Sequence, residues 1–231
     1  INNFKKQSVL SLPIYDLSSD GRKAVSLNFS RLHFVRPGYG YINFEDPWKN
    51  KISPSDDGIW IIDVEKNKIE ILLSLKEINR HVNANFKPTK SIDYVNHLRF
   101  SPDNNKLYFY YVWKYGNNNL DREIYPLVYD FDLKKLISIT SENISHECWV
   151  DNNNLMLWSN DTMCYNIYNL ADGSSKSFNK KHLNEDGHPT SIGKEELLTD
   201  TYPNRMGYQS IFHYKKKKNL LGKFSVPHHL N

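Results

Sequence analysis

Short runs that alternate hydrophobic and polar residues fill this chain, and turn-forming residues separate them. Alternation with a period of two is typical of β-strands that are buried on one face. The separating segments are rich in Asp, Asn, Gly and Pro, as in Ser19-Asp20-Gly21 and Pro102-Asp103-Asn104. These residues tolerate the conformations that tight hairpins need. The pattern therefore predicts an all-β protein built from hairpins.

The same order of four strands and three connections recurs four times. A repeat of roughly 40 to 50 residues with several short strands is typical of a β-propeller blade. We expect strands at 9–17, 23–29, 59–64 and 69–75 in the first repeat and at 94–100, 107–113, 124–131 and 136–140 in the second. Strands at 144–150, 155–159, 164–169 and 174–178 form the third repeat, and strands at 188–192, 196–201, 209–214 and 220–224 the fourth.

The whole chain, 1–231, is thus expected to be a single β-propeller segment. Its predicted blades are 9–75, 94–140, 144–178 and 188–224. Both ends read as parts of further blades, because 1–8 precedes the first strand and 224–231 leads out of the last. We therefore expect about four blades of a larger propeller, cut at both ends. The one helix expected is short and covers 75–82.

Charge and hydropathy narrow the classes of partner. The 231 residues carry a net charge of +4, and Lys215 to Lys218 is the only dense basic run. This run is expected to be a solvated hairpin rim, because no aromatic platform for nucleic acid accompanies it. No apolar run approaches the ~20 residues of a membrane span. We expect neither nucleic-acid nor membrane partners, and composition leaves the oligomeric state open.

Two cysteines, Cys148 and Cys164, are too few for a disulfide framework in a chain of this size. They are expected to be free thiols in a reducing compartment. Residues 1–6 lack the apolar core of a secretory signal. These features favour a cytoplasmic protein.

Three histidines stand at nearly the same place in successive repeats. His97, His146 and His188 are separated by 49 and 42 residues and each opens the first strand of its repeat. Equivalent positions in propeller blades are related by rotation about the central axis, where a ligand or metal can lie. Three neutral imidazoles suit Zn, Mn, Fe, Cu or Ni. The alternative is that each histidine is a core residue satisfied by a local hydrogen bond.

The loops that follow the second strand of each repeat are expected on the same face as these histidines, and they are long and rich in cations and tyrosines. Arginine pairs with carboxylate through two parallel hydrogen bonds, and tyrosine stacks on sugar rings. An anionic ring-shaped ligand such as a uronic-acid sugar therefore fits these loops. The alternative is that the arginines are only solvated and that Tyr202-Pro203 only shapes its loop. The loop residues singled out are Arg31, Arg36, Tyr39, Lys114, Arg122, Tyr202 and Arg205.

Two segments go beyond generic blade patterning. Ile144-Ser145-His146-Glu147-Cys148-Trp149 resembles the blade-opening segment of oligogalacturonate lyases, and Asp186-Gly187-His188-Pro189 with Thr199-Asp200-Thr201-Tyr202-Pro203 resembles their bacterial relatives. The Ser101-Pro102-Asp103 turn is a looser mark of the wider TolB-like, WD40-like propellers. The resemblance implies a seven-bladed propeller, a divalent metal such as Mn held by His and Gln, and β-elimination on oligogalacturonides.

Carried over by position, the resemblance makes His146 and His188 site residues, and His97 is the matching residue of the blade before. No Gln-x-x-His-x-His cluster is visible in the chain. In β-elimination a base removes the C5 proton of a uronate whose carboxylate is neutralised, and the O4 leaving group is protonated as it departs. His97 or His146 is the expected base and Tyr202 the acid, while Arg31, Arg36 or Arg205 binds the carboxylate.

Two other functions stay open. One is a non-catalytic propeller that binds a glycan or a protein. The other is the propeller of a serine peptidase, although the chain has no Gly-x-Ser-x-Gly elbow.

Overall fold

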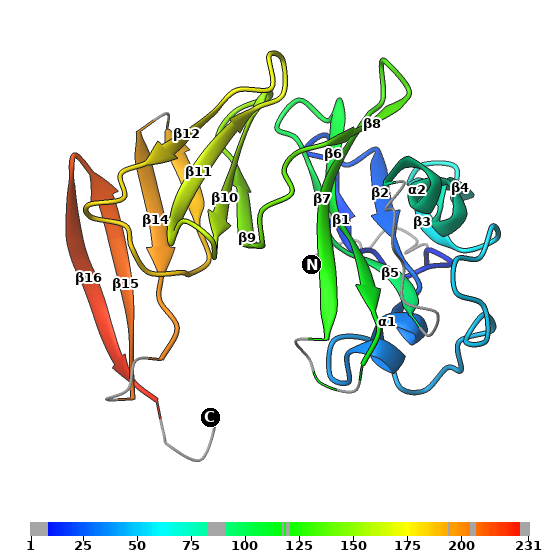
Figure 1. Cartoon of the computed structure of the whole chain (residues 1–231). Coiled ribbons are helices and arrows are strands. Elements are labelled where there is room, and N and C mark those ends of the chain that lie inside the picture. Colours follow the sequence, from blue (N-terminus) through cyan, green and yellow to red (C-terminus); the bar gives the residue numbers. More distant parts are fainter. Residues whose placement is uncertain are drawn as a thin grey trace, which may run out of the picture. The chain divides into compact units, whose positions relative to one another are not determined.

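The computed structural model of this chain describes residues 9–82, 91–116, 118, 121–193, 195–203 and 207–226. The chain forms two compact units, Ile1–Ser138 and Ile139–Asn231. Each unit contains two four-stranded antiparallel sheets (Figure 1), and strand order in every sheet follows the chain. The all-β prediction and the four repeats are confirmed at this level.

The first sheet contains one clear difference from the expected strands. The strand expected at 9–17 is reduced to two residues, because Pro13 has no N–H for a sheet ladder and its carbonyl accepts a bond from Ser26 Oγ at 2.6 Å. The order is β1-β2-β3-β4. The strands are β1 (Asp16–Leu17), β2 (Lys23–Ser26), β3 (Gly58–Asp63) and β4 (Lys68–Ser74).

A helix that the sequence pattern missed follows β2. Helix α1 (Phe29–Val35) begins after Asn28, whose side chain accepts the N–H of Arg31 at 2.9 Å. Asparagine is a strong N-cap because it satisfies one of the unpaired N–H groups of the first turn. This cap ends the strand that was expected to run to residue 29, and it turns the start of the expected loop 30–57 into helix.

The helix expected at 75–82 is confirmed as α2 (Leu75–Val82). Its start is a capping box: the Glu77 carboxylate accepts from the Ser74 N–H at 2.8 Å and from its hydroxyl at 2.6 Å. The Glu77 N–H in turn donates to Ser74 Oγ at 3.2 Å. Reciprocal bonds of this kind satisfy two helix-end donors at once. Leu75 and Ile78 are the buried residues of the helix.

The second sheet of the first unit has an apolar central strand. Every residue of β6 from Leu107 to Trp113 is buried, so this strand is covered on both faces. Aromatic and β-branched side chains dominate it, as expected for a sheet core. The strands are β5 (Ile92–Phe100), β6 (Lys106–Lys114), β7 (Arg122–Asp130) and β8 (Lys135–Ser138).

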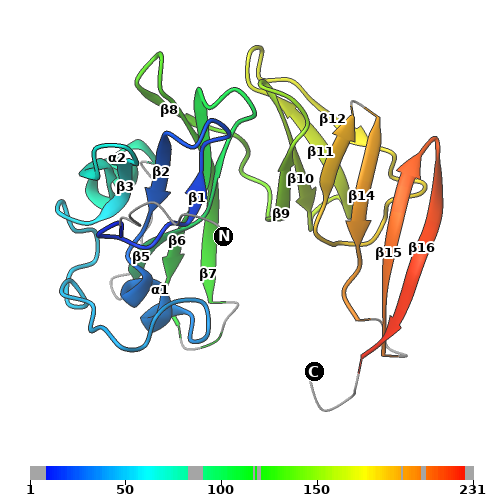
Figure 2. The ribbon, with the colours of Figure 1, turned by 180° about the vertical axis from the view of Figure 1, so that it is seen from behind.

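The first strands of the two sheets in this unit lie beside each other (Figure 2). Tyr15 donates to Asn96 Oδ1 at 2.8 Å, and the Phe100 N–H donates to Asp16 Oδ2 at 2.7 Å. The turns after these strands are also alike. Ser18 Oγ donates to Asp20 at 2.7 Å in one, and Ser101 Oγ donates to Asp103 at 2.6 Å in the other. The repeat seen in the sequence is therefore a repeat of turn geometry.

The second unit repeats the arrangement, with the first strands of its two sheets again in contact. One sheet contains β9 (Ile144–Trp149), β10 (Asn154–Ser159), β11 (Cys164–Asn169) and β12 (Ser175–Phe178). The other contains β13 (Thr190–Gly193), β14 (Glu196–Asp200), β15 (Tyr208–Lys215) and β16 (Lys217–Ser225). Buried side chains from both sheets form one core: Cys148, Met156, Trp158, Tyr165, Ile167, Phe178, Leu183, Leu197 and Tyr214.

Cys148 and Cys164 are thiols outside any disulfide, as expected, and both are buried. Localisation in the cytoplasm stays a prediction.

The lysine run lies where β15 turns into β16, and Lys215 pairs with Glu196 at 3.1 Å. Lys218 Nζ lies 3.9 Å from the centre of the Phe212 ring, and the absence of a nucleic-acid partner stays a prediction.

Candidate functional site

His146 occupies a β-bulge in the second unit. In the β9–β10 ladder Glu147 pairs with Leu157 and Ser145 pairs with Trp158, so His146 is the extra residue with no Cα partner. Bulges bend a strand and redirect a side chain, and they are common beside active sites. The bulge is thus the local feature that turns the His146 ring out of the ladder pattern.

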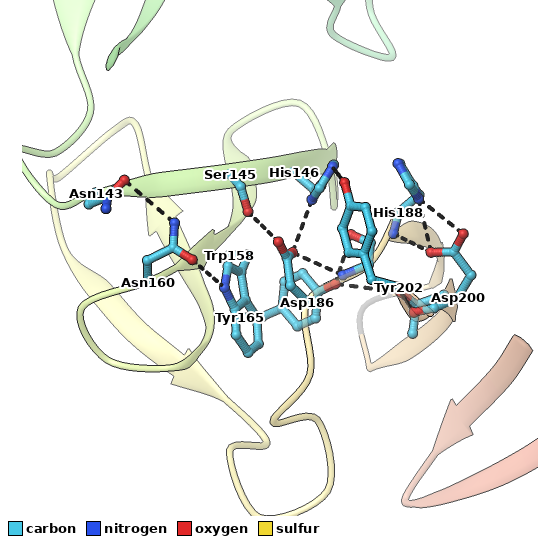
Figure 3. Close-up of polar contacts among 12 residues, drawn as sticks. Asn143, Ser145, His146, Trp158, Asn160, Tyr165, Asp186, His188, Asp200 and Tyr202 are labelled. Carbon is cyan, nitrogen blue, oxygen red and sulfur yellow. Dashed lines mark hydrogen bonds and ion pairs between the residues drawn. The ribbon is translucent and has the colours of Figure 1, made fainter. Parts of the chain in front are cut away.

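Asp186 fixes the orientation of that ring. Its Oδ1 lies 3.0 Å from His146 Nδ1, and its Oδ2 accepts from Ser145 Oγ at 2.6 Å (Figure 3). The Gly187 N–H also donates to Oδ1 at 2.9 Å. An ionised carboxylate only accepts, so the network assigns the proton of neutral His146 to Nδ1 and leaves Nε2 as an acceptor.

The hydroxyl of Tyr202 lies 2.9 Å from this His146 Nε2. Tyr202 follows β14 and is 51% exposed, so its phenol lies at the surface. With Nε2 as the acceptor, the phenol donates, and a chain of hydrogen bonds runs from Tyr202 through His146 to Asp186. Such a chain can move a proton to or from a bound molecule.

His188 forms a second imidazole–carboxylate pair beside the first. Its Nδ1 lies 3.0 Å from both oxygens of Asp200, the last residue of β14, and its backbone N–H donates to Asp200 Oδ1 at 2.6 Å. The rings of His188 and His146 have centroids 4.4 Å apart. The His188 side chain is 62% exposed. Two histidines oriented by two aspartates and one tyrosine therefore form a compact polar site (Figure 3).

Gly187 allows the two pairs to meet. A Cβ on this residue would lie 1.9 Å from the backbone oxygen of Asp200, so no other amino acid fits the close approach of the two segments. Below it, the buried hydroxyl of Tyr165 donates to the Gly187 carbonyl at 3.1 Å. Burial raises the pKa of this phenol, which keeps it protonated as a donor.

His97 belongs to the first unit and also occupies a bulge. Asn96 pairs with Tyr110 and Arg99 with Tyr108, which leaves His97 inside the irregular stretch. Its φ is 56°, a left-handed conformation that is uncommon for a residue other than glycine. Its N–H donates to the Tyr15 hydroxyl at 3.1 Å. The repeat thus places His97 and His146 in the same kind of backbone feature.

The predicted ligand-binding residues of the first unit divide into two groups. Arg31 is 1% exposed, and its five N–H groups bind Asp46 and the backbone oxygens of Asp93, Trp48, Lys51 and Ile52. This contradicts its predicted role as a substrate contact, because no donor is left for a ligand. The others lie at the surface or partly buried: Arg36, Tyr39, Lys114 and Arg122.

Arg205, predicted as a catalytic residue, lies outside the described residues. Two residues of the site were not predicted as such, Asp186 and Asp200. Both stand in the segments that carried the family resemblance, but Asp186 binds His146, 40 residues away, and Asp200 binds His188, 12 residues away, so no local sequence pattern pairs them. A carboxylate on Nδ1 is the usual partner of a working histidine.

The predicted metal site is incomplete in the part of the chain that the structure describes. No group of three or more His, Cys, Asp or Glu side chains there is placed to hold an ion. The pair His146 and His188 supplies two imidazoles, and Nε2 of His146 already accepts from Tyr202.

Among the residues that the structure describes, no helix has the length and apolar character needed to cross a membrane.

Neither a protein-family model nor a curated protein matches the sequence. Among solved structures, the chain is similar to oligogalacturonate lyase from Vibrio parahaemolyticus at 13% identity and a TM-score of 0.55, covering 91% of this chain and 53% of that one. It is similar to Pyrococcus horikoshii acylaminoacyl peptidase at 11% identity and a TM-score of 0.51, covering 89% and 31%. TolB from Acinetobacter baumannii shares 12% identity over 91% of this chain and 43% of that one, with a TM-score of 0.47.

At such identities the likeness is one of fold. It supports a propeller-like architecture of repeated four-stranded antiparallel sheets, which agrees with the sheets of both units. The chain spans 53% or less of the length of these proteins. The prediction of a propeller-like fold is therefore supported, while a seven-bladed ring and a single 1–231 segment stay predictions.

Proposed function

We propose that the second unit carries the acid–base site of a carbon–oxygen lyase that acts on uronic-acid oligosaccharides. The observation that carries this proposal is the hydrogen-bond chain from Tyr202 through His146 to Asp186, beside the second pair of His188 and Asp200. One group must take a proton and another must give one in β-elimination. In this site His188 can take the proton and Tyr202 can give one, and both side chains are exposed.

His188 is proposed as the base. Asp200 on Nδ1 leaves Nε2 as the acceptor, and the ring is exposed. It takes the proton from C5 of the uronate, the electron pair forms the C4–C5 double bond, and the C4–O bond breaks. This assignment replaces the expected base, which was His97 or His146. Nε2 of His146 already accepts from the phenol, and His97 is not used in this proposal because it belongs to the first unit.

Tyr202 is proposed as the acid. Its hydroxyl turns its proton from His146 Nε2 to the departing O4, and the phenolate that remains is reprotonated from solvent before it donates to Nε2 again. His146 and Asp186 act as positioning residues, since neither touches the substrate in this scheme. Each proton that is taken up at His188 is released to water before the next turnover, so the reaction is an elimination with no external reactant.

A divalent metal such as Mn stays a proposal, and no step above uses one. The experiment incubates the whole protein with oligogalacturonides and measures the ultraviolet absorbance of a C4–C5 double bond, with added Mn²⁺ and with a chelator. We expect the absorbance to rise, and the rise to disappear in His188→Gln. The matched control is His182→Gln, a histidine of the same unit outside the site. No rise with any uronide under either condition contradicts the lyase.

A second candidate is a propeller that binds glycans without cleaving them. Exposed aromatic side chains in α1 and the loop after it favour this candidate, because such rings stack on sugars. They include Phe34, Tyr39, Tyr41 and Phe44, each about half exposed or more. Oligosaccharide binding that is unchanged in His188→Gln, with no product from the wild type, supports this alternative.

A further inference from the structure

The backbone at Gly187 joins the two histidine–aspartate pairs of the second unit. The Gly187 N–H donates to Asp186 Oδ1 at 2.9 Å. The next N–H along the chain, that of His188, donates to Asp200 Oδ1 at 2.6 Å. Each aspartate in turn lies 3.0 Å from the Nδ1 atom of one histidine. Two consecutive peptide groups therefore orient both carboxylates, and a tilt of either peptide moves a carboxylate together with its imidazole.

The carbonyl between these two N–H groups accepts the buried hydroxyl of Tyr165. The Tyr165 oxygen lies 3.1 Å from the Gly187 carbonyl oxygen (Figure 3). That carbonyl and the His188 N–H belong to the same peptide group, which is planar. A hydrogen bond at the oxygen therefore helps to fix the direction in which the N–H points at Asp200. One chain of hydrogen bonds thus runs from Tyr165 through this peptide to Asp200 and on to the His188 ring.

The sheet below the site holds the phenol ring of Tyr165 in place. Tyr165 on β11 pairs with Trp158 on β10, and their rings meet edge to face with centroids 5.2 Å apart. Both side chains are buried, and the Trp158 Nε1–H donates to Asn160 Oδ1 at 3.1 Å, which fixes the indole as well. A phenylalanine would fill the same apolar space. The hydroxyl of Tyr165 therefore serves the peptide at Gly187 rather than the packing of the core.

We propose that Tyr165 is a positioning residue for His188 and acts through the peptide group between Gly187 and His188. Its hydroxyl keeps Asp200 opposite Nδ1, so that the proton of the neutral ring stays on Nδ1 and Nε2 stays the acceptor. The Gly187 N–H belongs to the preceding peptide group, so His146 should be affected less. For turnover this inference rests on the proposed function, whereas the proton positions on the two rings are independent of any reaction.

The test is Tyr165→Phe in the whole protein, read by the ¹⁵N chemical shifts of the histidine ring nitrogens at alkaline pH, where imidazoles are neutral. In the wild type His188 should show a protonated Nδ1 and an unprotonated Nε2. In the variant we expect the proton on Nε2 in part of the molecules, with a smaller change at His146. The kcat on oligogalacturonides should fall about tenfold, the value of roughly one hydrogen bond. KM should change little, because Tyr165 is buried below the site.

The matched control is Tyr214→Phe, which removes the hydroxyl of another buried tyrosine of the same core, one whose ring packs on Phe178. It should leave the ring nitrogens of both histidines and kcat unchanged. Unchanged His188 nitrogens in a folded Tyr165→Phe variant overturn the proposal. An equal change at His146 and His188 also overturns it, because that result indicates a general loosening of the site.

The wild type decides the question if Tyr165→Phe does not fold. A buried hydroxyl that donates to a backbone carbonyl exchanges its proton with water only when the fold opens. Slow exchange of the Tyr165 hydroxyl proton supports the proposal, and exchange as fast as that of free tyrosine overturns it. A wild type with no lyase activity overturns the proposed function alone, because the ring nitrogens can still be read.

Discussion

The hydroxyl of Tyr202 lies 2.9 Å from Nε2 of His146, a contact between residues 56 positions apart in the chain. It joins the end of β14 to the bulge of β9 and thus connects the two sheets of the second unit. The phenol faces the one imidazole nitrogen that Asp186 leaves unprotonated. A donor and an acceptor are thereby matched before any substrate binds, which is the preorganisation that acid–base catalysis needs.

Replacing Asp186 by Asn should disable the site with little loss of fold. An amide can keep its oxygen toward His146 Nδ1 and the Gly187 N–H, with its NH₂ group toward Ser145 Oγ, but it removes the negative charge beside His146. Without that charge Nε2 is a weaker acceptor, and the Tyr202 hydroxyl is held less firmly. We expect turnover to fall about 10²-fold or more, and Asp172→Asn, at an exposed turn of the same unit, to have no effect. Wild-type rates in Asp186→Asn would contradict a role for this carboxylate.

Gly187→Ala tests the close approach of the two histidine–aspartate pairs. The new Cβ would meet the Asp200 backbone oxygen, so the segment must move, at about 1–3 kcal/mol of unfolding free energy. We expect a lower melting temperature and loss of turnover together. The matched change is Gly193→Ala, where the nearest atom to a new Cβ is 3.8 Å away. Equal stability of the two variants would argue against the packing described for Gly187.

Arg31→Gln should be strongly destabilising and should not act on ligand binding. The substitution leaves Asp46 buried without its 3.1 Å ion pair and strips four backbone oxygens of a donor. Breaking a buried pair from one side costs about 3–5 kcal/mol. Urea unfolding measures the loss. Arg80→Gln should change stability by less than about 0.5 kcal/mol.

The contrast between Arg31 and His146 shows what the sequence could and could not predict. Alternation and turn residues were enough for the sheets, because strand pairing depends on local patterns and short connections. The burial of Arg31 depends on backbone oxygens from residues 48 to 93, which no local pattern reveals. His146 and His188 could be predicted because a histidine recurs at nearly the same place in successive repeats. Their aspartates escaped notice because Asp200 meets His188 only after β13 and β14 pair.

The capping box of α2 predicts a pH dependence. Hydrogen bonds from the Ser74 side chain and backbone lower the pKa of Glu77 in the folded state. A folded pKa below the unfolded one stabilises the fold at pH above the unfolded pKa, and this contribution is lost as the pH falls through the folded pKa. Glu77→Gln should therefore lower stability at neutral pH and approach the wild type in acid.

Urea unfolding at neutral pH and in acid below the folded pKa of Glu77 measures this difference. Glu65→Gln, on the exposed β3–β4 turn, is the control for removal of a surface carboxylate. A lowered carboxyl pKa requires that the loss of stability in Glu77→Gln be larger at neutral pH than in acid. A loss of stability that is larger in acid would refute the role of the ionised carboxylate.

The most direct test of the proposed chemistry is the Tyr202→Phe variant in the oligogalacturonide assay. It removes one oxygen, at a side chain that is half exposed, so the fold should be kept. We predict that the initial rate of double-bond absorbance falls about 10²–10⁴-fold, the usual contribution of a general acid, while substrate affinity changes little. A Tyr202→Phe rate equal to that of the wild type would contradict the acid–base site at Tyr202 and His146.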